Sequence, residues 1–527
     1  MDEKVEKKKG KSKLKVVIII LLIVIVAVVG FYIYNKKNKG TNNSITNDKT
    51  EVSSAYRMSG NGIENFDLSF LKLENKETNL LYSPLSIKYA LAMLSTGANG
   101  NSKAQIDAII GDYSSKKYIN SNNMSFANAM FIKDSFKDNV KKDYTDKLSS
   151  RYDASVIYDS FKTPDKINSF VSEKTFGLIN KLFDRDISSN NFFLVNALAI
   201  DMEWNKWLQA TSQSDYKDFY NVSYNHEKYN DYIEPIMGER YQTLKFNNNS
   251  INAKAVQIGA SINNYDIIKE LGEENIRKTI KSEYQSFIDE DSCGIRTNPD
   301  ANKDDLDVDK FTDKFISELK ENYKRVDSST DFMLYTDDKV KAFAKDLKTY
   351  NGTTLQYVGI MPKTDDLASY VKNLDSSDIS GIIKNLKEIK AENFTEGKVT
   401  KITGYIPLFK FDYQLQLKKD LKELGVLDVF DEKKADLSNM ITGTSNYIDS
   451  ADHKANIEFS NEGIKAAAVT VEGGFGSTGC GFEHLYDVPV EEINITFDKP
   501  YLFLIRDKDT GEVWFVGTVY EPITNVE

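Results

Sequence analysis

The spacing of apolar residues predicts a fold that mixes helices with strands. Apolar side chains recur at helical spacing over residues 84–95, and a second helical pattern over residues 416–424 ends at Gly425. Short runs rich in β-branched and aromatic residues predict strands at 192–200, 355–361, 501–506 and 513–519. An Asp/Thr/Gly turn separates the last two runs, which is typical of a hairpin. Because no regular strand–helix alternation appears, the pattern predicts an α+β fold.

Residues 16–34 form a long apolar run near the N-terminus. They carry no charge, and at about 1.5 Å per residue they nearly cross a hydrocarbon layer of roughly 30 Å. Lysines are more numerous before the run than directly after it, so we expect residues 1–15 to be a basic cytoplasmic tail. A cleaved signal peptide is the alternative, but the run is longer than usual and no small-residue cleavage site follows. The run is therefore interpreted as an uncleaved signal-anchor, a single transmembrane helix.

The composition after the anchor predicts a flexible linker over residues 35–60 and a folded extracellular domain over residues 61–527. The linker is rich in Asn, Lys, Thr and Ser. The whole chain has a formal net charge of −11, although its first 40 residues are basic. The folded part is therefore acidic, which argues against nucleic acid as a partner.

Candidate catalytic and metal-binding groups are sparse. The two cysteines, Cys293 and Cys480, allow one bridge at most and form neither a disulfide framework nor a metal cluster. The three histidines lie in unrelated contexts, and neither HExxH nor GxSxG occurs. We therefore expect no metal, no cofactor and no enzymatic activity.

The segment 461–481 departs from the surrounding pattern. A run of alanines is followed by β-branched residues and then by several glycines. The alanines favour a helix, but the residues after them do not extend one. The segment is therefore predicted to be able to change conformation.

Six segments, in this order, resemble the serpin family. They include NLLYSPLSIKYALAMLSTGANGNSKAQI (79–106), VSEKTFGLI (171–179), FLVNALAIDMEW (193–204), IPLFKFDYQLQLKKDLKELGVLDVF (406–430), DHKANIEFSNEGIKAAAVT (452–470) and FDKPYLFLIRDKDTGEVWFVGTVYEP (497–522). The resemblance implies a serpin fold of three β-sheets and eight to nine helices, with an exposed reactive centre loop near the C-terminus. It also implies a large insertion, roughly residues 240–330.

The resemblance implies that the loop is a bait for a target serine or cysteine protease. The protease cleaves the loop and becomes acylated, and the cut loop then inserts as a strand into the largest sheet. We therefore expect a membrane-tethered, extracellular suicide-substrate inhibitor. The alternative is a non-inhibitory serpin used for ligand binding or adhesion, which is favoured by the unusual Asn461 and Ile464 and by the long glycine-rich loop.

The resemblance also assigns the parts of this mechanism to residues. The hinge that enters the sheet comprises Glu462, Gly463, Ile464, Lys465, Ala466, Ala467 and Ala468. The polar gate that controls sheet opening comprises Ser83, Ser86, Asn196 and His453, and Trp204 marks the breach where insertion begins. Small alanines suit a strand that slides between two others, and glycine suits a hinge.

The scissile bond is not fixed by the sequence. Counting from the hinge places it between Ser477 and Thr478, whereas counting back from Phe497 places it nearer Leu485. Phe482 is a further candidate, suited to a chymotrypsin-like protease. Cys480 is either a free thiol or bridged to Cys293.

The predicted insertion is interpreted as a surface elaboration or as an exosite for the target protease. Residues 266–288 are predicted to be helical, and residues 289–309 are predicted to be loop-like.

Overall fold

A computed structural model describes residues 62–524. The parts of this range that it leaves undescribed are 112, 115–116, 209–232, 236–240, 298–302, 329, 444–445, 465–481, 483 and 485. The predicted tail, anchor and linker lie outside the described residues. Among the described residues, no helix is both long enough and apolar enough to cross a bilayer.

The described residues contain eleven α-helices, more than the eight to nine expected. They are α2 (Asn65–Leu73), α3 (Pro84–Gly97), α4 (Gly100–Ile110), α5 (Lys142–Tyr152), α6 (Asp165–Lys174), α8 (Ile267–Leu271), α9 (Glu273–Asp289), α10 (Val308–Asn322), α11 (Leu367–Asn373), α12 (Ser376–Lys384) and α13 (Leu417–Glu423). The predicted helices at 84–95 and 416–424 are confirmed as α3 and α13. Helix α3 starts where expected because the Ser83 hydroxyl accepts a hydrogen bond from the amide of Ser86 and Pro84 fills the first turn.

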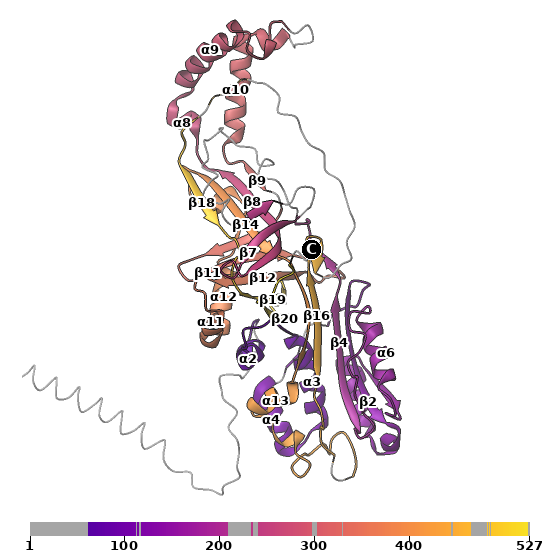
Figure 1. The fold of residues 1–527 in the computed structure, drawn as a ribbon. Coiled ribbons are helices and arrows are strands. Elements are labelled where there is room, and N and C mark those ends of the chain that lie inside the picture. Colours follow the sequence, from indigo (N-terminus) through magenta and orange to yellow (C-terminus); the bar gives the residue numbers. More distant parts are fainter. Residues whose placement is uncertain are drawn as a thin grey trace, which may run out of the picture. The chain divides into compact units, whose positions relative to one another are not determined.

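Two large sheets form the centre of the described domain (Figure 1). The seven-stranded sheet has the order β1 (Leu80–Tyr82), β20 (Val513–Val519), β19 (Tyr501–Asp507), β12 (Leu355–Pro362), β11 (Val340–Asp346), β10 (Met333–Thr336) and β13 (Lys387–Glu388). The six-stranded sheet has the order β18 (Val490–Asn494), β14 (Val399–Pro407), β8 (Ile251–Asn263), β7 (Gln242–Phe246) and β6 (Ile233–Pro235), and β9 (Val326–Ser328) pairs with β8. The strands predicted at 355–361, 501–506 and 513–519 are confirmed, including the final hairpin of β19 and β20.

Two smaller sheets bring the number of sheets among the described residues to four, one more than the three expected. One has the order β3 (Ala154–Asp159), β2 (Met124–Lys133) and β4 (Phe192–Ile200). The other has the order β15 (Phe409–Leu415), β16 (His453–Phe459), β17 (Gly463–Ile464) and β5 (Met202–Glu203). The strand predicted at 192–200 is confirmed as β4. Strands β4 and β16 run alongside each other in Figure 1, yet no hydrogen-bonded ladder joins them in the described part of the chain. The fourth sheet arises because this ladder is not formed.

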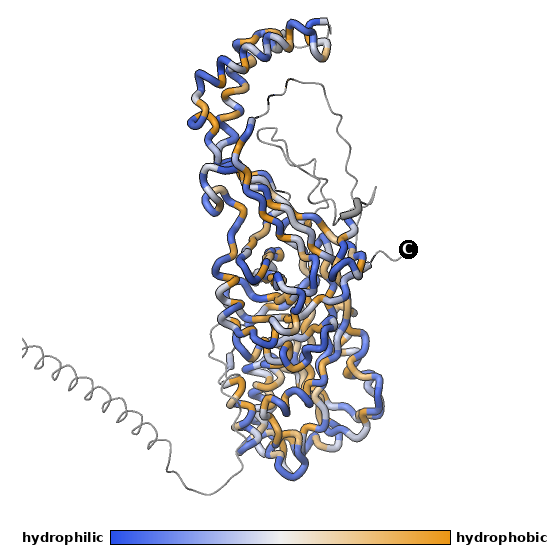
Figure 2. Tube along the Cα trace, turned by 60° about the vertical axis from the view of Figure 1, so that its left-hand side comes forward, coloured by the Kyte–Doolittle hydropathy of each residue, from blue (hydrophilic) through white to orange (hydrophobic). Residues whose placement is uncertain are grey.

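Helices α8, α9 and α10 follow β8 and lead into β9. The predicted helix at 266–288 is present as α8 and α9, divided at Gly272, whose φ of +82° favours glycine. The prediction of a loop over 289–309 was wrong at its end, because α10 starts at Val308. Figure 2 shows polar and apolar residues alternating along α9 and α10, as in amphipathic helices that pack on one face.

Candidate functional site: the loop hinge and the open sheet

The chain turns back on itself between β16 and β17. The Ser460 hydroxyl accepts hydrogen bonds from the amides of Glu462 and Gly463, at 3.3 and 3.2 Å. The Ser460 amide donates to the carbonyl oxygen of Gly463 at 3.0 Å. A serine in this position is a common turn-former, and this local signal could have identified Ser460 from the sequence. The turn places the start of the loop antiparallel to β16.

The hinge is already part of a sheet on its other side. Gly463 pairs with Glu203, and Ile464 pairs with Met202. The amide of Trp204 donates to the carbonyl oxygen of Glu462 at 2.8 Å. The predicted hinge residues Glu462, Gly463 and Ile464 are therefore held between β16 and β5, and the Ile464 side chain is 1% exposed.

Gly463 is required by the close approach of β5. A β-carbon built on Gly463 would lie 2.2 Å from the carbonyl oxygen of Met202 and 2.8 Å from the Cα of Glu203. Both neighbours are backbone atoms, so no side-chain rotation can relieve the overlap. The sequence suggested glycine for its conformational freedom, whereas the structure shows that the absence of a side chain is what matters here.

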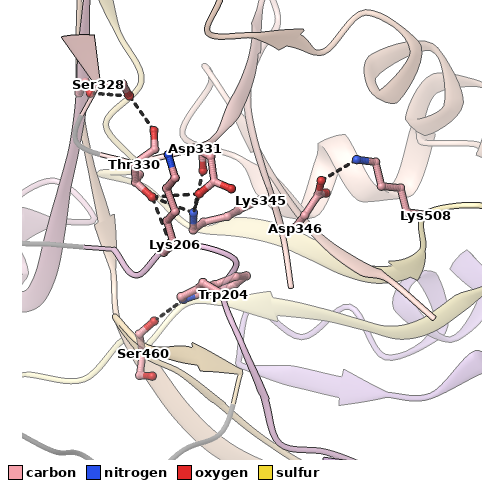
Figure 3. Close-up of polar contacts among 10 residues, drawn as sticks. Trp204, Lys206, Ser328, Thr330, Asp331, Lys345, Asp346, Ser460 and Lys508 are labelled. Carbon is pink, nitrogen blue, oxygen red and sulfur yellow. Dashed lines mark hydrogen bonds and ion pairs between the residues drawn. The ribbon is translucent and has the colours of Figure 1, made fainter. Parts of the chain in front are cut away.

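Trp204, predicted to mark the breach, lies directly against the turn between β16 and β17. Its side chain is fully buried, and its indole Nε1 donates to the carbonyl oxygen of Ser460 at 2.9 Å (Figure 3). Its ring packs against Phe459, with the ring centroids 5.4 Å apart. The tryptophan thus fastens the turn to the apolar core.

A buried lysine lies on the other side of this tryptophan (Figure 3). Lys345 Nζ donates to Thr330 Oγ1 at 2.8 Å, to the Asp331 carbonyl oxygen at 2.7 Å and to Asp331 Oδ1 at 2.6 Å. Burial lowers the pKa of Lys345, although the hydrogen bond and charge of Asp331 act in the opposite direction. Its ammonium lies 6.0 Å from the centroid of the Trp204 ring, within the range of a cation–π contact.

The four predicted gate residues surround one small cavity of about 30 Å³ between β4 and β16. The Ser83 amide donates to His453 Nε2 at 2.9 Å, and the Ser83 hydroxyl caps α3 through Ser86. Because Nε2 accepts a hydrogen bond, His453 is neutral in this arrangement. Burial lowers the pKa of His453 to about 4.

Asn196 is the member of this group that differs from the expectation. Its side-chain amide donates to Asn128 Oδ1 on β2 rather than to a gate residue. Its own Oδ1 has no hydrogen-bond partner among the described residues. Asn196 therefore borders the cavity without linking β4 to β16.

The remaining predicted site residues divide into two groups. The first group lies outside the described residues and comprises Lys465, Ala466, Ala467, Ala468, Ser477, Thr478 and Leu485. Phe482 is described, and its ring packs against aromatic side chains of α9 and α10. No local pattern in the sequence predicts these contacts, because they join segments that are distant along the chain.

Comparisons with known proteins identify relatives over most of the chain. A family model described as Serpin (serine protease inhibitor) matches residues 64–264 and 310–522. The leukocyte elastase inhibitor of Homo sapiens is 32% identical over 226 residues, which cover 40% of this chain and 55% of that protein. The leukocyte elastase inhibitor of Xenopus tropicalis is 25% identical over 489 residues, which cover 87% of this chain and 97% of that protein. The alignment with the human inhibitor thus spans about half of its length.

Solved structures of the same fold are also similar. The native state of the thermophilic serpin tengpin superposes with a TM-score of 0.56 at 19% identity, covering 92% of this chain and 96% of tengpin. Thyroxine-binding globulin in complex with thyroxine gives a TM-score of 0.54 at 15% identity, covering 87% of this chain and 98% of the globulin. At these identities the similarity shows the fold alone.

Proposed function

Because the chain belongs to the serpin family, we propose that it is a membrane-tethered, extracellular protease inhibitor that acts as a suicide substrate. The observation that carries this proposal is the position of Gly463 and Ile464. They form the short strand β17, paired with β16 on one side and with β5 on the other. This pairing supports the proposal, because a strand extended from Ile464 would start between two strands that already flank it.

The space ahead of β17 supports insertion of the rest of the loop. In the described part of the chain, strands β4 and β16 border it without a ladder between them, and cavities of about 30 and 70 Å³ lie along both strands. An added strand would pair with the free backbone groups of both edges, each hydrogen bond contributing about 0.5–1.5 kcal/mol net. The alanines predicted for this strand need little room between the two edges.

The covalent step follows from ordinary acyl transfer. The hydroxyl oxygen of a serine protease, or the thiolate sulfur of a cysteine protease, attacks the carbonyl carbon of the scissile bond. The C–N bond breaks, and the new amine takes up the proton that the catalytic base accepted from the nucleophile. The N-terminal part of the loop is then esterified or thioesterified to the protease. Insertion carries the protease away before water can hydrolyse this bond.

A protease panel read on a denaturing gel tests the proposal. We expect a covalent complex with at least one serine or cysteine protease, and a higher melting temperature after loop cleavage. An elastase-like enzyme is a sensible first choice, because small residues such as Ser477 suit it and the human relative is named as a leukocyte elastase inhibitor. Cleavage without any complex and without a gain in melting temperature would instead support the non-inhibitory alternative.

A pair of arginine variants makes this test specific for insertion. Ala466→Arg should turn the protein into a plain substrate, because an isolated buried charge is very costly. The control Glu274→Arg places the same side chain on an exposed position of α9 and should leave complex formation unchanged. Complex formation by both variants at the rate of the unaltered protein would show that residue 466 does not enter the sheet.

The membrane tether is the second part of the proposal. It is supported by the uncharged run at 16–34 and by the lysines before it. Protease treatment of intact cells should remove the serpin domain and leave a short anchored fragment. Survival of the whole domain until the cells are lysed would refute the proposed orientation.

A further inference from the structure

The segment that follows the reactive loop packs on α9 and α10 before it enters β18. The ring of Phe482 makes edge contacts with Tyr284, Phe287, Phe311 and Phe315, at centroid distances of 5.1 to 6.4 Å. Two of these residues lie on α9 and two on α10. The phenylalanine therefore joins both helices, which in Figure 1 lie beyond the ends of β8 and β18.

Further contacts hold the same segment over its next residues. His484 Nδ1 lies 2.5 Å from Glu283 Oε2 on α9, and the His484 ring packs against Tyr486. Val488 is 5% exposed in the same apolar cluster as Ile276 of α9. The chain then continues into β18, which runs parallel to β14. Phe482, His484, Tyr486 and Val488 are thus each held by packing or pairing before the chain enters β18.

Helices α9 and α10 also contact each other, so together they form one support for the segment. Tyr284 of α9 stacks on Phe311 of α10, with ring centroids 3.5 Å apart. Arg277 of α9 pairs with Asp313 of α10. Lys320 of α10 pairs with Glu273 of α9 at 2.7 Å.

We propose that α9 and α10 are a platform that anchors the C-terminal flank of the reactive loop and confines productive cleavage to bonds before Phe482. This inference rests on the proposed inhibitory function. A protease must take the side chain before the scissile bond into its own pocket. Phe482 can enter such a pocket only after leaving four aromatic neighbours, and cleavage beside Leu485 would require His484 to leave Glu283. The platform thereby removes Phe482 and Leu485 from the scissile candidates and leaves the bond between Ser477 and Thr478 among those that remain.

A bridge between the two cysteines would impose the same limit. Cys293, which follows α9, is disulfide-bonded, and Cys480 is the only other cysteine in the sequence. With such a bridge, a cut after Phe482 would leave residue 480 on the inserting fragment, tied to Cys293 and unable to move along the sheet. A cut before residue 480 leaves the inserting fragment free.

Digestion with chymotrypsin, followed by mass measurement of the fragments, tests the platform. Phe475 is the internal reference, because it is the same residue type and precedes Phe482 in the loop. We expect cleavage after Phe482 to be at least about tenfold slower than after Phe475, since the platform must open first. Equal rates at the two phenylalanines in the unaltered protein would overturn the inference.

Variants of the platform make the test specific. Phe311→Ala and, separately, Glu283→Ala should each raise the rate of cleavage after Phe482 and leave the rate after Phe475 unchanged. Glu318→Ala is the control, because it alters an exposed residue of α10 and should change neither rate. If both platform variants leave cleavage after Phe482 as slow as in the unaltered protein, these contacts do not protect it and the inference fails.

The platform and the proposed inhibitory function can fail independently of each other. A covalent complex whose cut maps after Phe482 or Tyr486 would refute the platform and leave inhibition intact. Protection of Phe482 in a protein that forms no complex would refute inhibition and leave the platform intact.

Discussion

Replacing Gly463 with alanine should expel the hinge from the sheet. The new methyl carbon would lie 2.2 Å from the carbonyl oxygen of Met202, a distance that no side-chain rearrangement can lengthen. Release of β17 would expose Ile464, at a cost of about 1.5–3 kcal/mol for a fully buried aliphatic side chain. It would also break the hydrogen bonds from the amide of Trp204 to the carbonyl oxygen of Glu462 and from the amide of Leu208 to that of Asn461, both 2.8 Å long, each contributing about 1 kcal/mol net. The hinge therefore loses roughly 4 kcal/mol of local stabilisation.

Hydrogen exchange at the amides of Trp204 and Leu208 measures this release directly. Both amides should lose protection by about three orders of magnitude, because 1.4 kcal/mol corresponds to a factor of ten. Gly381→Ala in α12 is the matched control, since its β-carbon would meet nothing within 4 Å. It should leave both amides protected. Unchanged protection in Gly463→Ala would show that β5 can yield to the methyl group, and that close approach does not determine the hinge residue.

The same variant tests the link between the hinge and inhibition. A cleaved loop would have to pass the same point of β5 in order to insert. The melting temperature of Gly463→Ala should therefore rise less on loop cleavage than that of the unaltered protein. An equal gain would mean that insertion does not depend on this contact.

Two further predictions concern stability. As the pH falls from about 6.5 to about 4, titration of His453 should lower the free energy of unfolding by up to about 3 kcal/mol. The reason is that its lowered pKa in the folded protein lets the unfolded chain bind a proton that the folded chain does not. His453→Gln does not titrate and should flatten the profile measured by urea unfolding; parallel profiles would contradict the assignment. Lys88→Met should lower the free energy of unfolding by about 3–5 kcal/mol, because it leaves Asp67 and Glu512 without their buried partner. Lys142→Met, which removes an exposed ion pair, should lower the free energy of unfolding by less than about 1 kcal/mol. Equal losses in the two variants would show that the buried lysine stabilises the fold no more than the exposed one.

The elements predicted from local pattern were largely confirmed, because their signals lie within a few residues. The run at 192–200 became β4 with the predicted bounds, and the cap at Ser83 set the start of α3. Helix α10 was missed, although Phe311, Phe315 and Leu319 follow helical spacing, because the polar stretch before it suggested a loop that continued to residue 309. Apolar spacing of this kind indicates which face of a helix is buried, but without a recognised capping residue it does not give the position at which the helix begins.

The features of the site that depend on distant neighbours could not be predicted. The resemblance to serpins brought Gly463 and Trp204 into consideration, but the backbone of Met202 that requires the glycine comes from another part of the chain. Phe482 suited a chymotrypsin-like pocket by its chemistry alone. Its contacts with Tyr284 and Phe311 depend on the tertiary packing of α9 and α10, so its seat on these helices had no counterpart in the local sequence.

The pairing of β17 has a kinetic consequence. Adding a strand to a sheet resembles helix formation. Pairing of the first residues carries the entropic cost of bringing the segments together, and the later residues then extend the ladder at a lower cost. In this protein Ile464 is already paired on two sides, with Phe459 of β16 and Met202 of β5, and Gly463 is paired with β5, so a nucleus is present. Under the proposed function, only propagation along β4 and β16 would remain after cleavage. The residues that follow Ile464 would then set the rate of strand growth relative to hydrolysis of the acyl bond, so substitutions there should change how often the protease is released.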